Sequence, residues 1–171
     1  CALPISQQLV AHAKGQGRAL NYGSAGAGSN AHLGMELFAQ RAGIAVDHVP
    51  YKGSAPLKND LLGGHLPLGV DGLAGLSDLI RAKRLVALAV LAPRRSTLAP
   101  EIPSLGDLGI ADVDANGWYG ALVPAGTPQQ VVARLNEALA AALQVPEVRD
   151  RLQSLGVEPV GGSSEAFQIG R

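Results

Sequence analysis

The fold of this chain is decided by the stretch Gly23-Ser24-Ala25-Gly26-Ala27-Gly28-Ser29-Asn30. It follows a short predicted strand over residues 19–22 and leads into a predicted helix, for which Ser29 is the N-cap and Gly43 the end. The first-turn N–H groups of such a helix have no partner within it, and the helix dipole adds positive charge there. The stretch therefore predicts a strand-to-helix loop that holds a small anion. The alternative is a plain tight turn whose glycines serve helix–strand packing.

Strands and helices are predicted to alternate on both sides of this loop. Further strands are predicted at residues 46–50, 66–71 and 85–91, and further helices at residues 7–14, 54–62 and 73–82. The apolar run Leu85–Leu91 is expected to be a fully buried strand. This alternation predicts βαβ units, and therefore an α/β fold with a parallel sheet flanked by helices.

The pattern changes near residue 117, where a domain boundary is expected. A strand is predicted at Trp118–Val123, and a helix follows it with Thr127 as N-cap and Pro128 as first residue. That helix carries apolar residues at helical spacing. A last helix at residues 146–155 and a short strand at 157–160 complete the expected elements.

Composition excludes several classes of function. The 171-residue chain has zero formal net charge and no basic stripe, so nucleic acid and anionic membranes are not expected partners. Its single cysteine, Cys1, provides neither a disulfide framework nor a metal cluster. The four histidines have no metal-ligand spacing, although His32 lies in the first turn of the helix after the glycine loop. We expect no metal and no cofactor, and His32 is either part of the anion site or a core or surface histidine.

Two further groups follow predicted strands at the edge where open α/β sheets bind ligands. Tyr51-Lys52-Gly53 comes after the strand at 46–50, and Asp71 ends the strand at 66–71. Lys52 could add positive charge to an anion site, and Tyr51 a wall or a hydroxyl, although a surface lysine would look the same. Asp71 could accept a hydrogen bond from a ligand amine or hydroxyl, or it could cap the next helix.

An enzyme is the alternative class. Gly26-Ala27-Gly28 imitates the first half of a dinucleotide-binding fingerprint, and Asp47 lies near the place of a ribose-binding acid. However, Asp47 precedes Val49 and Pro50, whereas the ribose acid should come at the end of its strand. No nucleophile, base and orienting group converge in the sequence, and Ser24 lacks the glycine pattern of a nucleophile elbow. We therefore expect a binding protein, with a nucleotide-dependent Rossmann-type enzyme as the alternative.

The two ends of the chain look foreign to the rest. Residues 1–5 and 168–171 can be back-translated to sequencing-adapter sequences, so native sequence is expected from about Ser6 to Phe167.

Several motifs in one order resemble a known family. They are Leu20–Leu33, Val49–Pro56, Asp60–Gly64, Leu88–Val90, Pro103-Ser104 and Pro124–Pro128. Together they resemble the substrate-binding receptors of tripartite tricarboxylate transporters, also called Bug receptors. The resemblance covers about Ser6 to Phe167.

The resemblance implies a periplasmic receptor of the type II binding-protein fold, truncated at both ends. Residues 6–116 are expected to form the second ligand-binding lobe, and residues 117–167 a crossover strand and a C-terminal part of the first lobe. The implied ligand is a small organic carboxylate, delivered to the membrane subunits of the transporter by a monomeric receptor. The expected ligand-binding residues are Ser24, Ala25, Gly26, Ala27, Gly28, Ser29, Asn30, His32, Tyr51, Lys52, Gly53 and Asp71. Gly72 departs from the family, where an amide or a larger polar residue is common.

Overall fold

A computed structural model of the chain describes residues 5–163. The chain divides into two compact units, one ending at Gly117 and the other beginning at Trp118. Of the ends expected to be foreign, residues 1–4 and 168–171 lie outside the described residues. No helix in the described part of the chain is long and apolar enough to cross a membrane.

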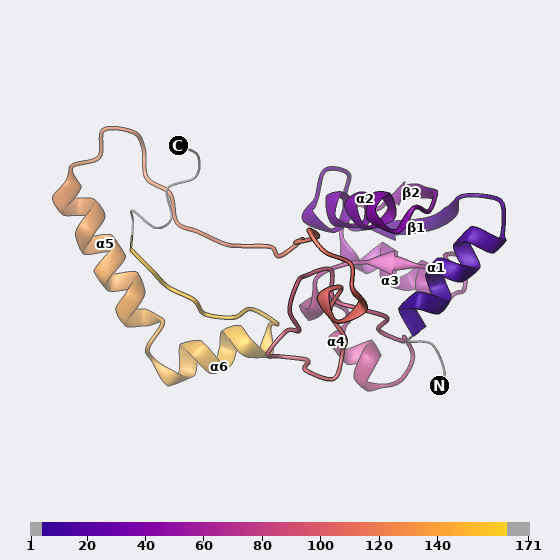
Figure 1. Cartoon of the computed structure of the whole chain (residues 1–171). Coiled ribbons are helices and arrows are strands. Elements are labelled where there is room, and N and C mark those ends of the chain that lie inside the picture. Colours follow the sequence, from indigo (N-terminus) through magenta and orange to yellow (C-terminus); the bar gives the residue numbers. More distant parts are fainter. Residues whose placement is uncertain (1–4, 164–171) are drawn as a thin grey trace. The chain divides into compact units, whose positions relative to one another are not determined.

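The first unit is built on a three-stranded parallel sheet (Figure 1). Its strands are β1 (Leu20–Ser24), β2 (Val46–Pro50) and β3 (Gly69–Val70), in the order β2-β1-β3. Ser24 pairs with Pro50 on one side and with Val70 on the other, so the three strands end together. The predicted α/β class with a parallel sheet is confirmed, although the third strand is much shorter than expected.

Helices cover both faces of this sheet because side chains alternate along β1. The helices are α1 (Ile5–Gly15), α2 (Asn30–Ala42), α3 (Ser54–Leu62) and α4 (Leu73–Arg81), and a 3₁₀ turn η1 spans Gly106–Leu108. Tyr22 belongs to the buried cluster with Met35 and Phe38 of α2. Gly23 faces the other way, and a Cβ added there would lie 2.7 Å from Cδ1 of Leu57 in α3. Figure 1 shows α2 and α3 on opposite sides of the strands.

The expected buried strand at Leu85–Leu91 is wrong. Only Val90 forms a bridge among the described residues of that run: its N–H donates to Pro103 O at 2.8 Å, and its carbonyl accepts from the N–H of Leu105 at 3.1 Å. The segment is not fully buried either, because Val86 is 69% exposed. An apolar run becomes a strand only where a neighbour continues the hydrogen-bonded ladder, and here the ladder stops after one bridge.

The second unit contains α5 (Gln129–Ala142) and α6 (Pro146–Ser154). Neither of the strands expected at 118–123 and 157–160 forms within the described part of this unit. The helix start was also misassigned, because Pro128 is the N-cap and the helix begins at Gln129. The hydroxyl of Thr127 donates to Pro124 O at 2.8 Å instead, so it closes the preceding turn.

The apolar face of α5 was predicted correctly in its spacing but is not buried in this unit. Val131, Leu135 and Leu139 are each nearly half exposed. Apolar residues at this spacing form one stripe along a helix, which a globular protein normally covers.

Candidate ligand-binding site

The carboxyl edge of the sheet brings the three predicted segments together. The glycine loop follows β1, Tyr51-Lys52-Gly53 follows β2, and Asp71 follows β3. Two backbone hydrogen bonds attach the second segment to the first: Tyr51 N–H donates to Ser24 O at 2.9 Å, and Gly53 N–H donates to Ala25 O at 3.0 Å. This is the edge at which open α/β sheets hold their ligands.

The glycine loop ends in a well-formed helix N-terminus, as predicted. Ser29 is the N-cap of α2, and its hydroxyl oxygen accepts a hydrogen bond from His32 N–H at 3.2 Å. The same hydroxyl donates to Gly26 O at 2.7 Å, which ties the loop to the cap. Gly28 has a φ of +76°, in the left-handed region that glycine adopts without strain. At the other end of α2, Gly43 closes the helix with a φ of 64°.

Three backbone amides of this loop and first turn remain available to a ligand. Among residues 5–163, no hydrogen bond is made by the N–H of Ala27, Asn30 or Ala31. By contrast, the N–H of Gly28 donates to His32 Nδ1, and the N–H of Ser29 donates to Gly26 O. Free amides at the positive end of a helix dipole are donors suited to a carboxylate or another small anion.

Ser24 lies deeper than its predicted role suggested. It is fully buried, its hydroxyl donates to Gly26 O at 3.0 Å, and Nε2 of His48 lies 2.7 Å from the same oxygen. Ser24 therefore supports the loop from below.

His32 and His48 form a pair under the loop. His32 Nδ1 accepts the Gly28 N–H at 3.0 Å, and its ring stacks on that of His48 with centroids 4.0 Å apart. His48 was not singled out from the sequence, because its place beside Tyr22 follows from the β1–β2 register. The pair is not part of a metal cluster: within the described residues, no group of three or more His, Cys, Asp or Glu side chains could hold a metal ion.

The segment after β2 contributes less side-chain chemistry than expected. The Tyr51 hydroxyl donates to Oδ2 of Asp60 at 2.6 Å, and this bond raises the pKa of Tyr51. Its hydroxyl is thus committed to α3. Lys52 is exposed at the edge of the sheet, and Gly53 is the N-cap of α3 with a φ of 98°. Lys52 is the side chain of this segment that can bring positive charge to an anion.

Asp71 does not cap α4, whose N-cap is Gly72 with no side-chain cap hydrogen bond, and its ligand-binding role stays a prediction. Its Oδ1 accepts the N–H of Gly72, the residue before α4, at 2.8 Å. Its Oδ2 is buried and has no hydrogen-bond partner among the described residues. Oδ2 lies close to α4, since a Cβ added to Gly75 would be 2.9 Å away. A buried carboxylate oxygen that accepts no hydrogen bond is uncommon in proteins, so Oδ2 could accept a hydrogen bond from a ligand or a water molecule.

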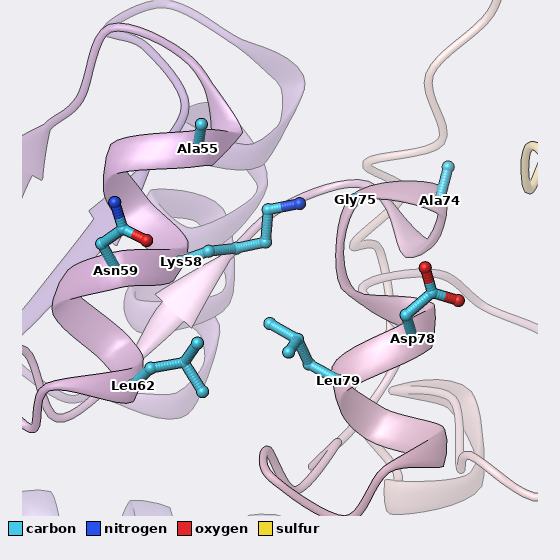
Figure 2. Close-up of a pocket in the computed structure, with 8 residues that line it drawn as sticks. All are labelled: Ala55, Lys58, Asn59, Leu62, Ala74, Gly75, Asp78 and Leu79. Carbon is cyan, nitrogen blue, oxygen red and sulfur yellow. The ribbon is translucent and has the colours of Figure 1, made fainter.

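A groove lies between α3 and α4, apart from the predicted site residues (Figure 2). It has a volume of about 350 Å³ and is lined by Ala55, Lys58, Asn59, Leu62, Ala74, Gly75, Asp78 and Leu79. In Figure 2 the Lys58 side chain extends from α3 toward α4. None of the expected ligand-binding residues lines this groove.

The geometry also bears on the dinucleotide alternative. Asp47 is the second residue of β2, where it pairs with Asn21, and it does not lie at the carboxyl end of the strand. A ribose-binding acid belongs at that end, beside the glycine loop. A parallel sheet with free helix amides, a lysine and an aspartate at its carboxyl edge has the arrangement with which open α/β domains hold small ligands.

Comparison with known proteins identifies the family. The model described as "Tripartite tricarboxylate transporter family receptor" matches residues 2–169, and the chain therefore belongs to this family. The resemblance found in the sequence motifs is confirmed. The family consists of receptors, so the prediction of a binding protein holds against the Rossmann-type enzyme.

Individual relatives agree with this assignment. A protein encoded in the tcbD–tcbE intergenic region of Pseudomonas sp. strain P51 is 36% identical over 95% of this chain and 48% of its own length. Protein BugT of Bordetella pertussis is 35% identical over 89% of this chain and 47% of its own length. A structure of an R. palustris protein with adipate has a TM-score of 0.81 and 32% identity, and covers 94% of this chain and 54% of that one. The chain thus spans about half the length of these relatives.

Proposed function

We propose that this chain captures a small organic carboxylate at the carboxyl edge of its sheet. The observation that carries the proposal is the set of three unpaired amides, from Ala27, Asn30 and Ala31, around the N-terminus of α2. A carboxylate bound there would accept hydrogen bonds from donors that the fold already holds in place. Hydrogen bonds to a charged group are worth about 1.5–3 kcal/mol each.

The neighbouring groups favour an acid with a second polar end. Lys52 can attract a further negative charge, and Oδ2 of Asp71 can accept a hydrogen bond from a ligand hydroxyl or amine. The R. palustris relative solved with adipate, a dicarboxylate, supports this class of ligand. We therefore propose a dicarboxylate or a hydroxylated or aminated acid as the ligand.

The site formed by this chain is half of a complete one. Because the chain spans about half the length of its relatives, we propose that residues 6–116 are one lobe of a two-lobed receptor. Residues 117–167 would be a crossover and part of the other lobe. The rest of that lobe would cover the exposed stripe of α5, formed by Val131, Leu135 and Leu139. The receptor would act as a monomer in the periplasm and deliver its ligand to the membrane subunits of a tripartite transporter.

Calorimetric titration of the full-length receptor that carries this chain tests the proposal. Adipate is expected to bind saturably, whereas its uncharged dimethyl ester is expected not to bind, because only the free acid offers a charged acceptor. Titration with NAD serves as the second comparison. Binding of NAD together with no response to a series of mono- and dicarboxylates would refute the carboxylate site.

A further inference from the structure

The stacked histidines lie next to the glycine loop, where the ring of His32 accepts the N–H of Gly28. His32 comes from the first turn of α2 and His48 from the middle of β2, and their rings are inclined by only 19°. The ring of Tyr22, the β1 partner of His48, lies 5.0 Å from the His48 ring. The three rings therefore join α2, β2 and β1 beside the glycine loop.

From β2, a chain of hydrogen bonds runs up to the loop. The Ser24 hydroxyl donates its proton to Gly26 O at 3.0 Å. His48 Nε2 lies 2.7 Å from the Ser24 oxygen and must therefore be the donor of that contact. His48 thus fixes Ser24, and Ser24 fixes the carbonyl of Gly26.

A second chain runs from α2 to the same carbonyl. The Ser29 hydroxyl also donates to Gly26 O, at 2.7 Å, and accepts from the His32 N–H at 3.2 Å. The His32 ring completes this branch, because its Nδ1 accepts the Gly28 N–H at 3.0 Å. Nδ1 must carry no proton to accept this bond, so the bond exists only while His32 is neutral. The two branches meet at Gly26 O above and at the histidine stack below.

This closed arrangement determines which amides remain free. The carbonyl of Gly26 accepts hydrogen bonds from the hydroxyls of Ser24 and Ser29, and the N–H of Gly28 donates to His32 Nδ1. The unpaired amides of Ala27, Asn30 and Ala31 are left for a ligand. Without the two histidines, the Gly28 amide loses its acceptor and the Ser24 hydroxyl oxygen loses the contact with His48 Nε2.

We propose that His32 and His48 are positioning residues, which hold the glycine loop in its carboxylate-binding shape while His32 is neutral. Neither side chain touches the ligand in this scheme. The effect on affinity rests on the proposed function, whereas the effect on loop geometry does not.

The surroundings of the pair act on the protonation of His48 in opposite directions. Burial lowers the pKa of His48, the neighbouring His32 lowers it further, and Glu36 of α2 acts in the opposite direction. Oε1 of Glu36 lies 3.9 Å from His32 Nε2 and also accepts the Tyr22 hydroxyl at 2.8 Å. Two imidazolium rings stacked at this distance would repel each other. The arrangement therefore favours a pair with at most one positive charge.

The first test follows the Gly28 amide proton by NMR from pH 8 to pH 5 in the full-length receptor. The amide resonance is expected to move upfield with the imidazole titration of His32, because protonation removes its acceptor. In His32→Asn, whose side-chain oxygen can accept the same bond and does not titrate, the Gly28 resonance is expected to stay constant. A wild-type Gly28 resonance that ignores the His32 titration would overturn the proposal.

The second test compares two substitutions of His48 by their affinity for adipate. His48→Leu removes the donor to Ser24 and is expected to weaken binding about tenfold, the equivalent of one net hydrogen bond. His48→Gln keeps an N–H donor and is expected to recover most of this loss. Equal losses in the two variants would show that the ring matters only for packing, and would contradict the proposal. If the wild-type receptor binds no adipate, the proposed function fails, and the Gly28 measurement still decides the positioning role.

Discussion

Replacing Gly28 by alanine tests whether the shape of the glycine loop matters to the protein. Gly28 has a φ of +76°, and a Cβ added there would meet nothing within 4 Å. The cost of the substitution is therefore backbone strain alone, about 1–2 kcal/mol for an L-residue in the left-handed region. Gly26→Ala is the matched comparison, because Gly26 also has open space around it but does not have a positive φ.

The strain is expected to change one of two measurable quantities, the free energy of unfolding or the affinity for the ligand. If the loop keeps its shape in Gly28→Ala, the free energy of unfolding falls by about 1–2 kcal/mol. If the loop relaxes, stability is retained and the dissociation constant for adipate rises instead, by about five- to thirtyfold for the same free energy. Urea denaturation and calorimetric titration of the full-length receptor together account for both outcomes.

The comparison with Gly26→Ala decides the reasoning. That variant is expected to change the free energy of unfolding by clearly less than Gly28→Ala. Equal stability and affinity for wild type and Gly28→Ala would show that the loop has no strained conformation at residue 28. Equal losses in both variants would show that any added methyl group is harmful there, whatever its backbone angle.

Two further predictions concern the support of the first unit. Tyr22→Phe removes the hydrogen bond to Glu36, which is half exposed and can bind water instead. We therefore expect the free energy of unfolding, measured by urea denaturation, to fall by only about 1 kcal/mol. A fall of less than 0.3 kcal/mol, roughly the error of such comparisons, would contradict this. The hydrogen bond from the Ser104 N–H lowers the pKa of Asp107 most, and the bond from Arg95 lowers it further. The stabilisation that the ionised Asp107 provides is therefore full above the ordinary aspartate pKa, and it is lost as the pH falls through the lowered pKa. Asp107→Asn is therefore expected to flatten the acid limb of a stability–pH profile, and an unchanged limb would refute the coupling.

The sequence predicted what depends on local chemistry. The N-cap at Ser29 and the C-cap at Gly43 were recognisable because each follows from the conformation and side chain of one residue. The parallel sheet was also predictable, because its strands alternate with helices along the chain. The segments expected to bind a ligand were placed together by the general rule that parallel strands end at one edge.

The errors at Val90 and His48 arise because structure there depends on distant partners, whereas the error at Thr127 has a local cause. Val90 was expected within a buried strand, but its ladder stops at one bridge to Ser104. Thr127 has the side chain of an N-cap, yet its hydroxyl bonds to Pro124 and leaves the cap position to Pro128. His48 was overlooked because its neighbours belong to β1 and α2, and the pairing register that joins them is not written in the local sequence.

The central claim, that backbone amides of α2 hold a carboxylate, can be tested at Asn30. Asn30 is the first residue of the helix and follows Ser29, whose ψ of 160° is compatible with a proline after it. Asn30→Pro therefore removes one N–H with little strain, and Asn30→Ala is the control that removes only the side chain.

The decisive measurement is the ratio of the adipate dissociation constants of these two variants in the full-length receptor. One charge-assisted hydrogen bond of about 1.5–3 kcal/mol predicts a constant roughly ten- to 150-fold larger for Asn30→Pro than for Asn30→Ala. Equal constants for two folded variants would show that the amide of Asn30 does not bind the ligand, and would contradict the account.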